Sequence, residues 1–190
     1  MDKTSLQKWK LISSQDISPS HWFPLERRVY QLPSGVLVDD FTVTTLADVS
    51  MVVPITVDGT VLLVRQYKPG IDAVLVQFAA GRREERHASF EQLAIEELAE
   101  EAGAECRPEN LVLLGKVSGF STKASEIVYV YLAQEVTRTT EQHLDVTEDI
   151  EVLEVPVSQV EAALKSESTW CAQSLSAWQL ALEQLHKQGN

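Results

Sequence analysis

Short runs of apolar and β-branched residues, separated by turn signals, fill the first part of the chain. Runs at residues 9–13, 27–32 and 36–43 are typical of strands, and a Leu-Pro-Ser-Gly turn precedes the third. We expect these runs to form a small antiparallel β-element over residues 1–45, ahead of a larger domain over residues 46–190.

The larger domain combines strand-like runs with helical spacing. An Asp-Gly pair at positions 58 and 59, between two β-branched runs, is a strong hairpin signal. Further segments are predicted as strands at residues 74–78, 111–114, 127–133 and 150–155, and as helices at residues 156–165 and 175–185. Strands mixed with a helix inserted in mid-chain predict an α+β fold, an α-β-α sandwich built on a mixed sheet.

The clearest helical pattern of the chain lies between Ser89 and Gly103. Ser89 and Gln92 have the spacing of a capping box, and Gly103 is suited to end the helix. Apolar residues recur at intervals of three and four and predict a face that packs on the core: Phe90, Leu93, Ala94, Leu98 and Ala102.

The same helix carries an unusual concentration of negative charge. Glu97, Glu100 and Glu101 stand three and four positions apart and therefore share one face, and no basic residue within the helix offsets them. Two interpretations are open. The carboxylates form a solvated acidic surface, or they bind Mg²⁺ or Mn²⁺, since Mg²⁺ prefers a few carboxylates together with waters and phosphate oxygens.

Composition narrows the classes of partner and compartment. The net charge of −12 argues against a nucleic-acid backbone as the main partner, and an anionic substrate would need local cations or a metal ion. No apolar run approaches the length of a membrane span, and the N-terminus has no signal-peptide core, so we expect a cytoplasmic protein. The two cysteines have no metal-binding spacing.

The glycine and acidic cluster together resemble the Nudix hydrolases, whose box is written G-x5-E-x7-R-E-U-x-E-E-x-G-U with U aliphatic. Gly81 and the run E-L-A-E-E-A-G-A at residues 97–104 carry the match. Residues 64–70, V-R-Q-Y-K-P-G, and residues 77–81, Q-F-A-A-G, are similar to motifs of the ADP-ribose pyrophosphatase branch. Residues 147–151, T-E-D-I-E, resemble the late acidic loop of that branch.

The resemblance implies a metal-dependent hydrolase that cleaves the pyrophosphate of a nucleoside-diphosphate sugar such as ADP-ribose. It assigns the metal ion, Mg²⁺ or Mn²⁺, to Glu97, Glu100, Glu101 and a backbone carbonyl near Ala80, with Glu97 and Glu100 also catalytic. Glu148 is expected to be a further metal ligand or the general base, and it is the third expected catalytic residue. Asp145 and Glu151 are lesser candidates, and a solvated acidic loop is the alternative for this whole segment.

Several cationic and aromatic residues are candidate substrate contacts. Arg65 and Lys68 stand near the end of a predicted strand, close in sequence to the Gly81 loop, and could bind phosphate or ribose oxygens or simply be surface charges. Arg28, with Trp22 and Phe23, could clamp a nucleobase, as N-terminal elements of the family do across a dimer; packing is the alternative for the aromatics. A homodimer is expected, because the N-terminal β-element is too small to bury both faces alone.

Departures from the box suggest a second possible function. The first Glu and the Arg of the box fall on Ala88 and Glu96, and Gln77 and Ser118 replace other family residues. The alternative is therefore a non-catalytic Nudix domain that binds a nucleotide ligand or a partner.

The loop before the helix supplies cations in place of the missing box arginine. Arg82, Arg83 and Arg86 could counter the acidic cluster, and Arg82 or Arg83 could pair with Glu96. His87, a lone loop histidine, is expected to be exposed.

Overall fold

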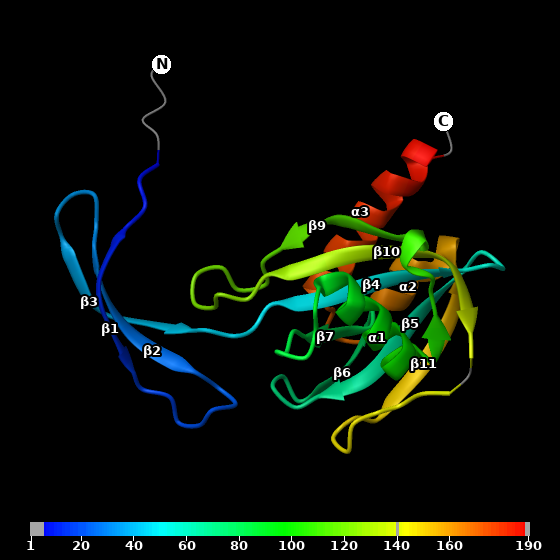
Figure 1. Ribbon diagram of the computed structural model, residues 1–190, viewed down its shortest axis with the longest axis horizontal. Coiled ribbons are helices and arrows are strands. Elements are labelled where there is room, and N and C mark those ends of the chain that lie inside the picture. Colours follow the sequence, from blue (N-terminus) through cyan, green and yellow to red (C-terminus); the bar gives the residue numbers. More distant parts are fainter. Residues whose placement is uncertain (1–5, 140, 189–190) are drawn as a thin grey trace. The chain divides into compact units, whose positions relative to one another are not determined.

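The computed structural model describes residues 6–139 and 141–188 (Figure 1). The chain divides into two compact units, one of residues 1–47 with 120–126 and one of residues 48–119 with 127–190. The roles expected of the N-terminal element, in dimerisation and in substrate binding, stay predictions.

The smaller unit contains a three-stranded antiparallel sheet in the order β1-β2-β3, formed by β1 (Lys10–Asp16), β2 (Leu25–Gln31) and β3 (Leu37–Thr44). Its aromatic cluster consists of Trp9, Tyr30 and Phe41, whose ring centroids lie 5.6–5.9 Å apart edge to face. Every residue of β1 is exposed. The predicted antiparallel element is confirmed, and it presents apolar side chains to its surroundings.

The larger unit is built on an eight-stranded mixed sheet. Its central path has the order β11-β5-β4-β10-β8, with β6 paired to β5, β7 to β4 and β9 to β10. Strands β4 and β10 run parallel, whereas all other pairs are antiparallel. The strands are β4 (Val49–Thr56), β5 (Thr60–Lys68), β6 (Ala73–Gln77), β7 (Ala80–Arg82), β8 (Ala104–Glu105), β9 (Leu111–Val117), β10 (Val128–Arg138) and β11 (Ile150–Pro156).

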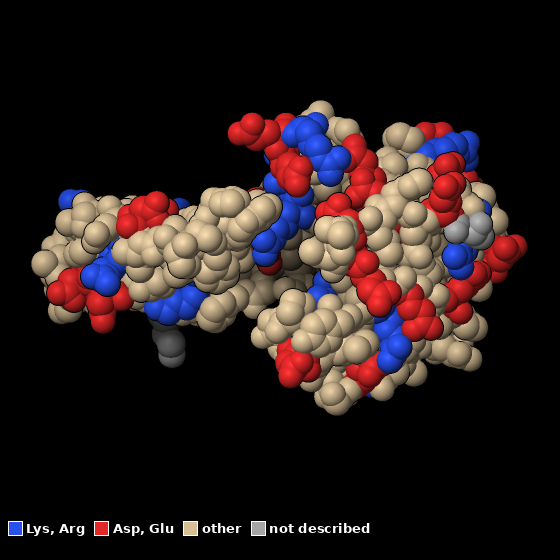
Figure 2. Space-filling view, turned by 90° about the horizontal axis from the view of Figure 1, so that it is seen from below, with Lys and Arg blue, Asp and Glu red and all other residues tan. Residues whose placement is uncertain are grey.

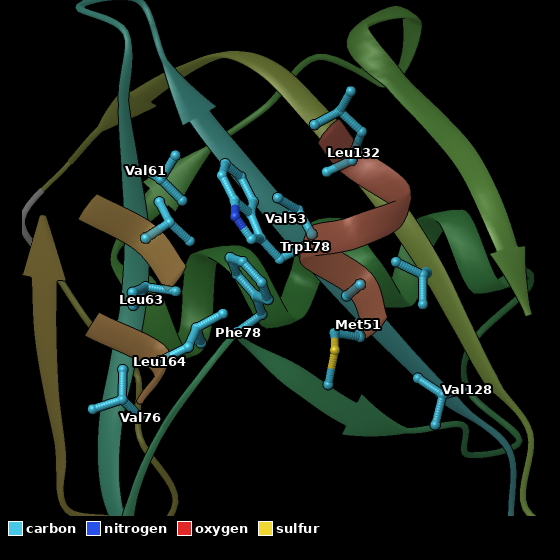
Figure 3. Close-up of a cluster of buried hydrophobic side chains, with 14 residues drawn as sticks. Met51, Val53, Val61, Leu63, Val76, Phe78, Val128, Leu132, Leu164 and Trp178 are labelled. Atoms are coloured by element: carbon cyan, nitrogen blue, oxygen red, sulfur yellow. The ribbon is translucent and has the colours of Figure 1, made fainter. Parts of the chain in front are cut away.

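Alternate residues of a strand point to opposite sides of the sheet, and helices cover both of these faces. Leu63 of β5 belongs to the core cluster beneath α2 (Val160–Leu164) and α3 (Ala172–Gln188), in which Phe78 packs near Trp178 (Figure 3). Leu62 belongs to a second cluster, which includes Leu98 of α1 (Phe90–Ala102). The predicted α-β-α sandwich is confirmed.

Both ends of α1 are formed by local hydrogen bonds. The Ser89 hydroxyl accepts the backbone N–H of Gln92 at 3.1 Å, and Gly103 adopts the left-handed conformation with φ 57°. The predicted cap at Ser89 is confirmed, and only the reciprocal bond of the capping box is shifted by one residue, since Gln92 Oε1 accepts the N–H of Ala88 at 3.0 Å. This shift ties the preceding loop to the first turn of the helix.

Some elements differ from the sequence expectation. β10 continues to Arg138, five positions beyond the expected end at 133, through an irregularity in which Glu135 has a φ of 53°. The helix expected at residues 156–165 begins as a 3-10 turn, Val157–Gln159, and only then becomes α2. Within the described residues no helix combines the length and apolar character needed to cross a membrane.

Candidate functional site

Glu101 lies at the end of α1 and is buried against the sheet, with only 3% of its surface exposed. Its Oε2 accepts the backbone N–H of Ala80, on β7, at 2.9 Å. A buried carboxylate requires such a partner, because desolvation of an ion is costly. The interpretation of the acidic cluster as a solvated surface is therefore wrong for Glu101.

Glu97, one turn earlier on the helix, lies against the backbone of Gly81. A Cβ atom placed on Gly81 would overlap the carboxyl group of Glu97, so any residue with a side chain would displace one or the other. Gly81 is held in the sheet by its pairing with Ser50 of β4. The glycine of the motif therefore provides the space in which a glutamate carboxyl group sits.

Burial raises the pKa values of both carboxylates above the ordinary glutamate value. Burial, followed by repulsion from Glu101, Glu100 and Glu148, raises the pKa of Glu97 to about 8. Burial also raises the pKa of Glu101, to about 7, while the Ala80 N–H and the charge of Lys68 act in the opposite direction. A bound cation would oppose the repulsion among these groups.

The loop that carries Glu148 is fastened to the end of α1. The N–H of His143 donates to the Glu100 carbonyl at 3.0 Å, and Gln142 Nε2 donates to the Glu101 carbonyl at 2.6 Å. The partly buried Glu148 accepts the Asp145 N–H at 3.0 Å. These contacts place Glu148 close enough for its charge to raise the pKa values of Glu97 and Glu101.

The two basic candidates, Lys68 and Arg65, lie on opposite sides of strand β5. Lys68 lies on the same side of β5 as Leu62, which packs beneath α1, and its charge lowers the pKa of Glu101. Arg65 has the opposite parity, and it forms ion pairs with Glu167 at 2.7 Å and Glu151 at 3.1 Å. The structure therefore places Lys68 on the side of the sheet where the carboxylates lie. Arg65 and the lesser candidate Glu151 are instead paired with each other.

Two buried glutamines on the α1 side of the sheet were not among the predicted site residues. Gln66 follows the parity of Lys68, and Gln77 pairs with Val64 on the same face. Gln66 lies close enough to Glu101 to lower its pKa, although Nε2 of Gln66 has no hydrogen bond of good geometry within the described residues. The period of two along β5 was the signal that could have identified Gln66.

The surroundings of Glu96 differ from the prediction. Its carboxylate faces Arg86 at 3.5 Å, His87 at 3.1 Å and Gln92 at 2.6 Å, rather than Arg82 or Arg83.

Arg83 is directed to a different set of groups. It donates to the carbonyl oxygens of His87 and Ala88 at 3.4 Å and lies over the ring of Phe90. His87 is 3% exposed, so the expectation of an exposed histidine is wrong.

The candidates in the smaller unit have their own partners. Arg28 Nε lies 2.9 Å from a carboxylate oxygen of Glu26, and its guanidinium also donates to the hydroxyl of Tyr30 at 3.1 Å. Trp22 is 77% exposed, and its ring centroid lies 4.5 Å from that of His21. Phe23 is half exposed.

The carboxylate oxygens of this site suit a hard divalent cation that takes its remaining ligands from the substrate. In the described part of the chain, no three His, Cys, Asp or Glu side chains group closely enough to hold a metal ion by themselves. Mg²⁺ usually takes one or two protein carboxylates and completes its shell with waters and substrate phosphates. Glu97 and Glu101 meet that requirement, and acidic side chains are spread over the face of the larger unit seen in Figure 2.

Comparisons with known proteins identify the family and support the fold. The family model of the NUDIX domain matches residues 45–178. The ADP-ribose pyrophosphatase of Bacillus subtilis (strain 168) is 30% identical over 132 residues, which cover 67% of this chain and 68% of that protein. A solved structure described as an ADP compounds hydrolase is 25% identical, with a TM-score of 0.83, over 97% of this chain and 98% of that one.

The contact between Gly81 and Glu97 predicts a coupled effect on stability. Gly81→Ala should lower the free energy of unfolding by about 1–3 kcal/mol, because the new methyl group overlaps the Glu97 carboxyl group. In a Glu97→Ala background the same substitution should cost much less, since the overlapping atoms are gone. Urea denaturation of the four proteins measures this coupling, and additive losses would contradict the contact.

The raised pKa of Glu97 predicts how the stability of metal-free protein depends on pH. The folded state holds the proton of Glu97 up to about pH 8, whereas an unfolded glutamate releases it near 4.5. The stabilisation is complete below about pH 4.5 and is lost as the pH rises toward 8. In chelator, the free energy of unfolding should fall over this range. Glu97→Gln should flatten the fall, and the exposed Glu105→Gln control should not.

Proposed function

This chain belongs to the NUDIX domain family, and from that premise we propose that it cleaves the pyrophosphate of a nucleoside-diphosphate sugar such as ADP-ribose. The products would be a nucleoside monophosphate and a sugar phosphate. The observation that carries the proposal is the pair of carboxylates, buried Glu101 and partly buried Glu97, held against the backbone of Ala80 and Gly81. The names of both similar proteins, which refer to ADP-ribose and ADP compounds, support the substrate class.

Glu97 and Glu101 are the proposed primary ligands of Mg²⁺ or Mn²⁺, with Glu100 and the carbonyl of Ala80 as further ligands. Bound metal would neutralise the pyrophosphate charge and favour attack by a water molecule in line with the leaving group. The raised pKa values of Glu97 and Glu101 imply that metal binding competes with protons. Metal affinity should therefore increase with pH.

Other residues of the chain act on the substrate and the water. Glu148 would orient the attacking water and accept its proton, a role that needs a carboxylate within reach of the reacting atoms. Lys68, whose charge acts on Glu101, would bind a phosphate oxygen. Arg28 and Arg65 are proposed as further substrate contacts, and each would exchange a carboxylate partner for a phosphate or ribose oxygen.

Homodimerisation is the proposed assembly. Half-exposed Leu11 and Ile12 lie side by side on β1, and no helix belongs to the smaller unit within the described residues. A three-stranded sheet is stable when an apolar face is covered, and a second copy of the chain would supply that cover. Light scattering at micromolar concentration should report a dimer, and a monomer would contradict the proposal.

The hydrolytic activity can be tested with a matched pair of carboxylate variants. Purified protein with Mg²⁺ or Mn²⁺ should hydrolyse at least one member of a panel of nucleotide sugars. Glu101→Gln should lower kcat/KM by about 100-fold or more, because it removes a charged ligand while an amide oxygen can still accept the Ala80 N–H. Glu105→Gln, an exposed control just beyond α1, should retain activity.

The outcomes separate the two candidate functions. Turnover by the unaltered protein that is no higher than that of Glu101→Gln would contradict the hydrolase proposal. Calorimetric binding of a nucleotide sugar without turnover and without any Mg²⁺ or Mn²⁺ site would instead support the non-catalytic binding domain.

A further inference from the structure

His87 and Glu96 form a pair that the proposed chemistry leaves without a role. His87 lies in the loop before α1, and its side chain is 1% exposed, whereas Glu96 directly precedes Glu97 on the helix. Nε2 of His87 lies 3.1 Å from Oε2 of Glu96. Within the described residues neither atom has a hydrogen bond of good geometry, and Nε2 of His87 has the Glu96 carboxylate as its neighbouring ion-pair partner.

Backbone hydrogen bonding assigns the proton of this histidine. The N–H of Glu84 donates to Nδ1 of His87 at 2.9 Å, and an atom that accepts a hydrogen bond there cannot itself carry a proton. The proton of the neutral ring therefore resides on Nε2, which faces the carboxylate of Glu96. The 3.1 Å approach of Nε2 to the Glu96 carboxylate is close, although it is not a hydrogen bond of good geometry within the described residues.

Gln92 completes the attachment of the loop to the helix. Its Oε1 accepts the N–H of Ala88 at 3.0 Å, and its Nε2 donates to Oε1 of Glu96 at 2.6 Å. Both oxygens of Glu96 thus face donors, one from the loop and one from the helix. The loop of residues 84–88 is consequently fixed at the helical position immediately before Glu97.

The same loop carries Arg86, which also pairs with Glu96. Arg86 NH1 lies 3.5 Å from Oε2 of Glu96, and the charge of Arg86 lowers the pKa of Glu97. Glu97 therefore has the Gly81 backbone against its carboxyl group, and the residue before it on the helix is tied to the loop.

We propose that His87 and Glu96 are positioning residues that hold Glu97 in the orientation its proposed metal-binding role requires. This inference rests on the proposed function. Counted back from the Glu97 run, Glu96 has the place of the box arginine, and Ala88 has the place of the first glutamate. An acceptor thus stands in place of the arginine, and its partner from the loop is His87, one residue before the position of that glutamate.

Conservative and disruptive variants of His87 separate positioning from folding. His87→Leu should weaken Mn²⁺ affinity by about tenfold and lower kcat with little change in KM, as expected when an outer partner of a metal ligand is lost. His87→Gln should recover most of both quantities, because its amide Nε2 can still donate to Glu96. Glu85→Gln, an exposed carboxylate change in the same loop, is the control and should match the unaltered protein.

A charge-exchange cycle tests whether the two residues act as a unit. His87→Glu alone opposes two carboxylates, and Glu96→Arg alone removes the acceptor and approaches Arg86. Each should weaken Mn²⁺ binding by about tenfold or more, whereas the double variant H87E/E96R should recover most of the loss. Mn²⁺ affinity is measured with the metal alone by electron paramagnetic resonance, on variants shown by circular dichroism to be folded.

The results distinguish this inference from the function on which it rests. Additive losses in the cycle, or equal losses in His87→Leu and His87→Gln, would overturn the positioning role while Mn²⁺ binding and hydrolysis by the unaltered protein stand. If the unaltered protein neither binds Mn²⁺ nor hydrolyses a nucleotide sugar, the proposed function fails and the positioning role fails with it. Recovery in both His87→Gln and the double variant supports the role.

Discussion

The main constraint on this molecule is that two glutamate side chains of α1 lie against a glycine-containing strand. Unpaired ions are costly to bury, and the raised pKa values of Glu97 and Glu101 express that cost. The surrounding fold supplies a donor from Ala80 and the space above Gly81, which pairs with β4. The cap at the end of α1 and the loop fastened to it hold the helix against the sheet.

Because side chains alternate along β5, the polar and charged residues of this strand are divided between the two faces of the sheet. Gln66 and Lys68 share the side that α1 covers, whereas Arg65 is held by acidic residues that follow α2 and lie on β11. Sequence proximity to the glycine motif made both Arg65 and Lys68 candidate substrate contacts and favoured Arg65. A shift of one residue in strand register would exchange them, so strand pairing, rather than the motif itself, decides which cation reaches the carboxylates.

Local signals predicted much of this structure. The Asp-Gly hairpin, the cap at Ser89, the terminating Gly103 and the family resemblance each depend on residues close together in sequence. The parallel pairing of β4 with β10, the three-residue β7 and the burial of His87 depend on contacts between distant segments or on elements too short to leave a periodic pattern. For the same reason the partners of Glu96 were misassigned: four arginine or histidine side chains lie within one loop, and only the folded path of that loop selects among them.

The contact of His87 with Glu96 bears on how the charge at one position of a buried pair can change. Replacing one member of a glutamate–arginine pair by the opposite charge would first bring like charges together in a desolvated place, and that is a severe loss. A neutral imidazole avoids this intermediate, because it can lie beside a guanidinium without full repulsion and can donate to a carboxylate. A histidine in such a place is therefore compatible with a partner of either charge.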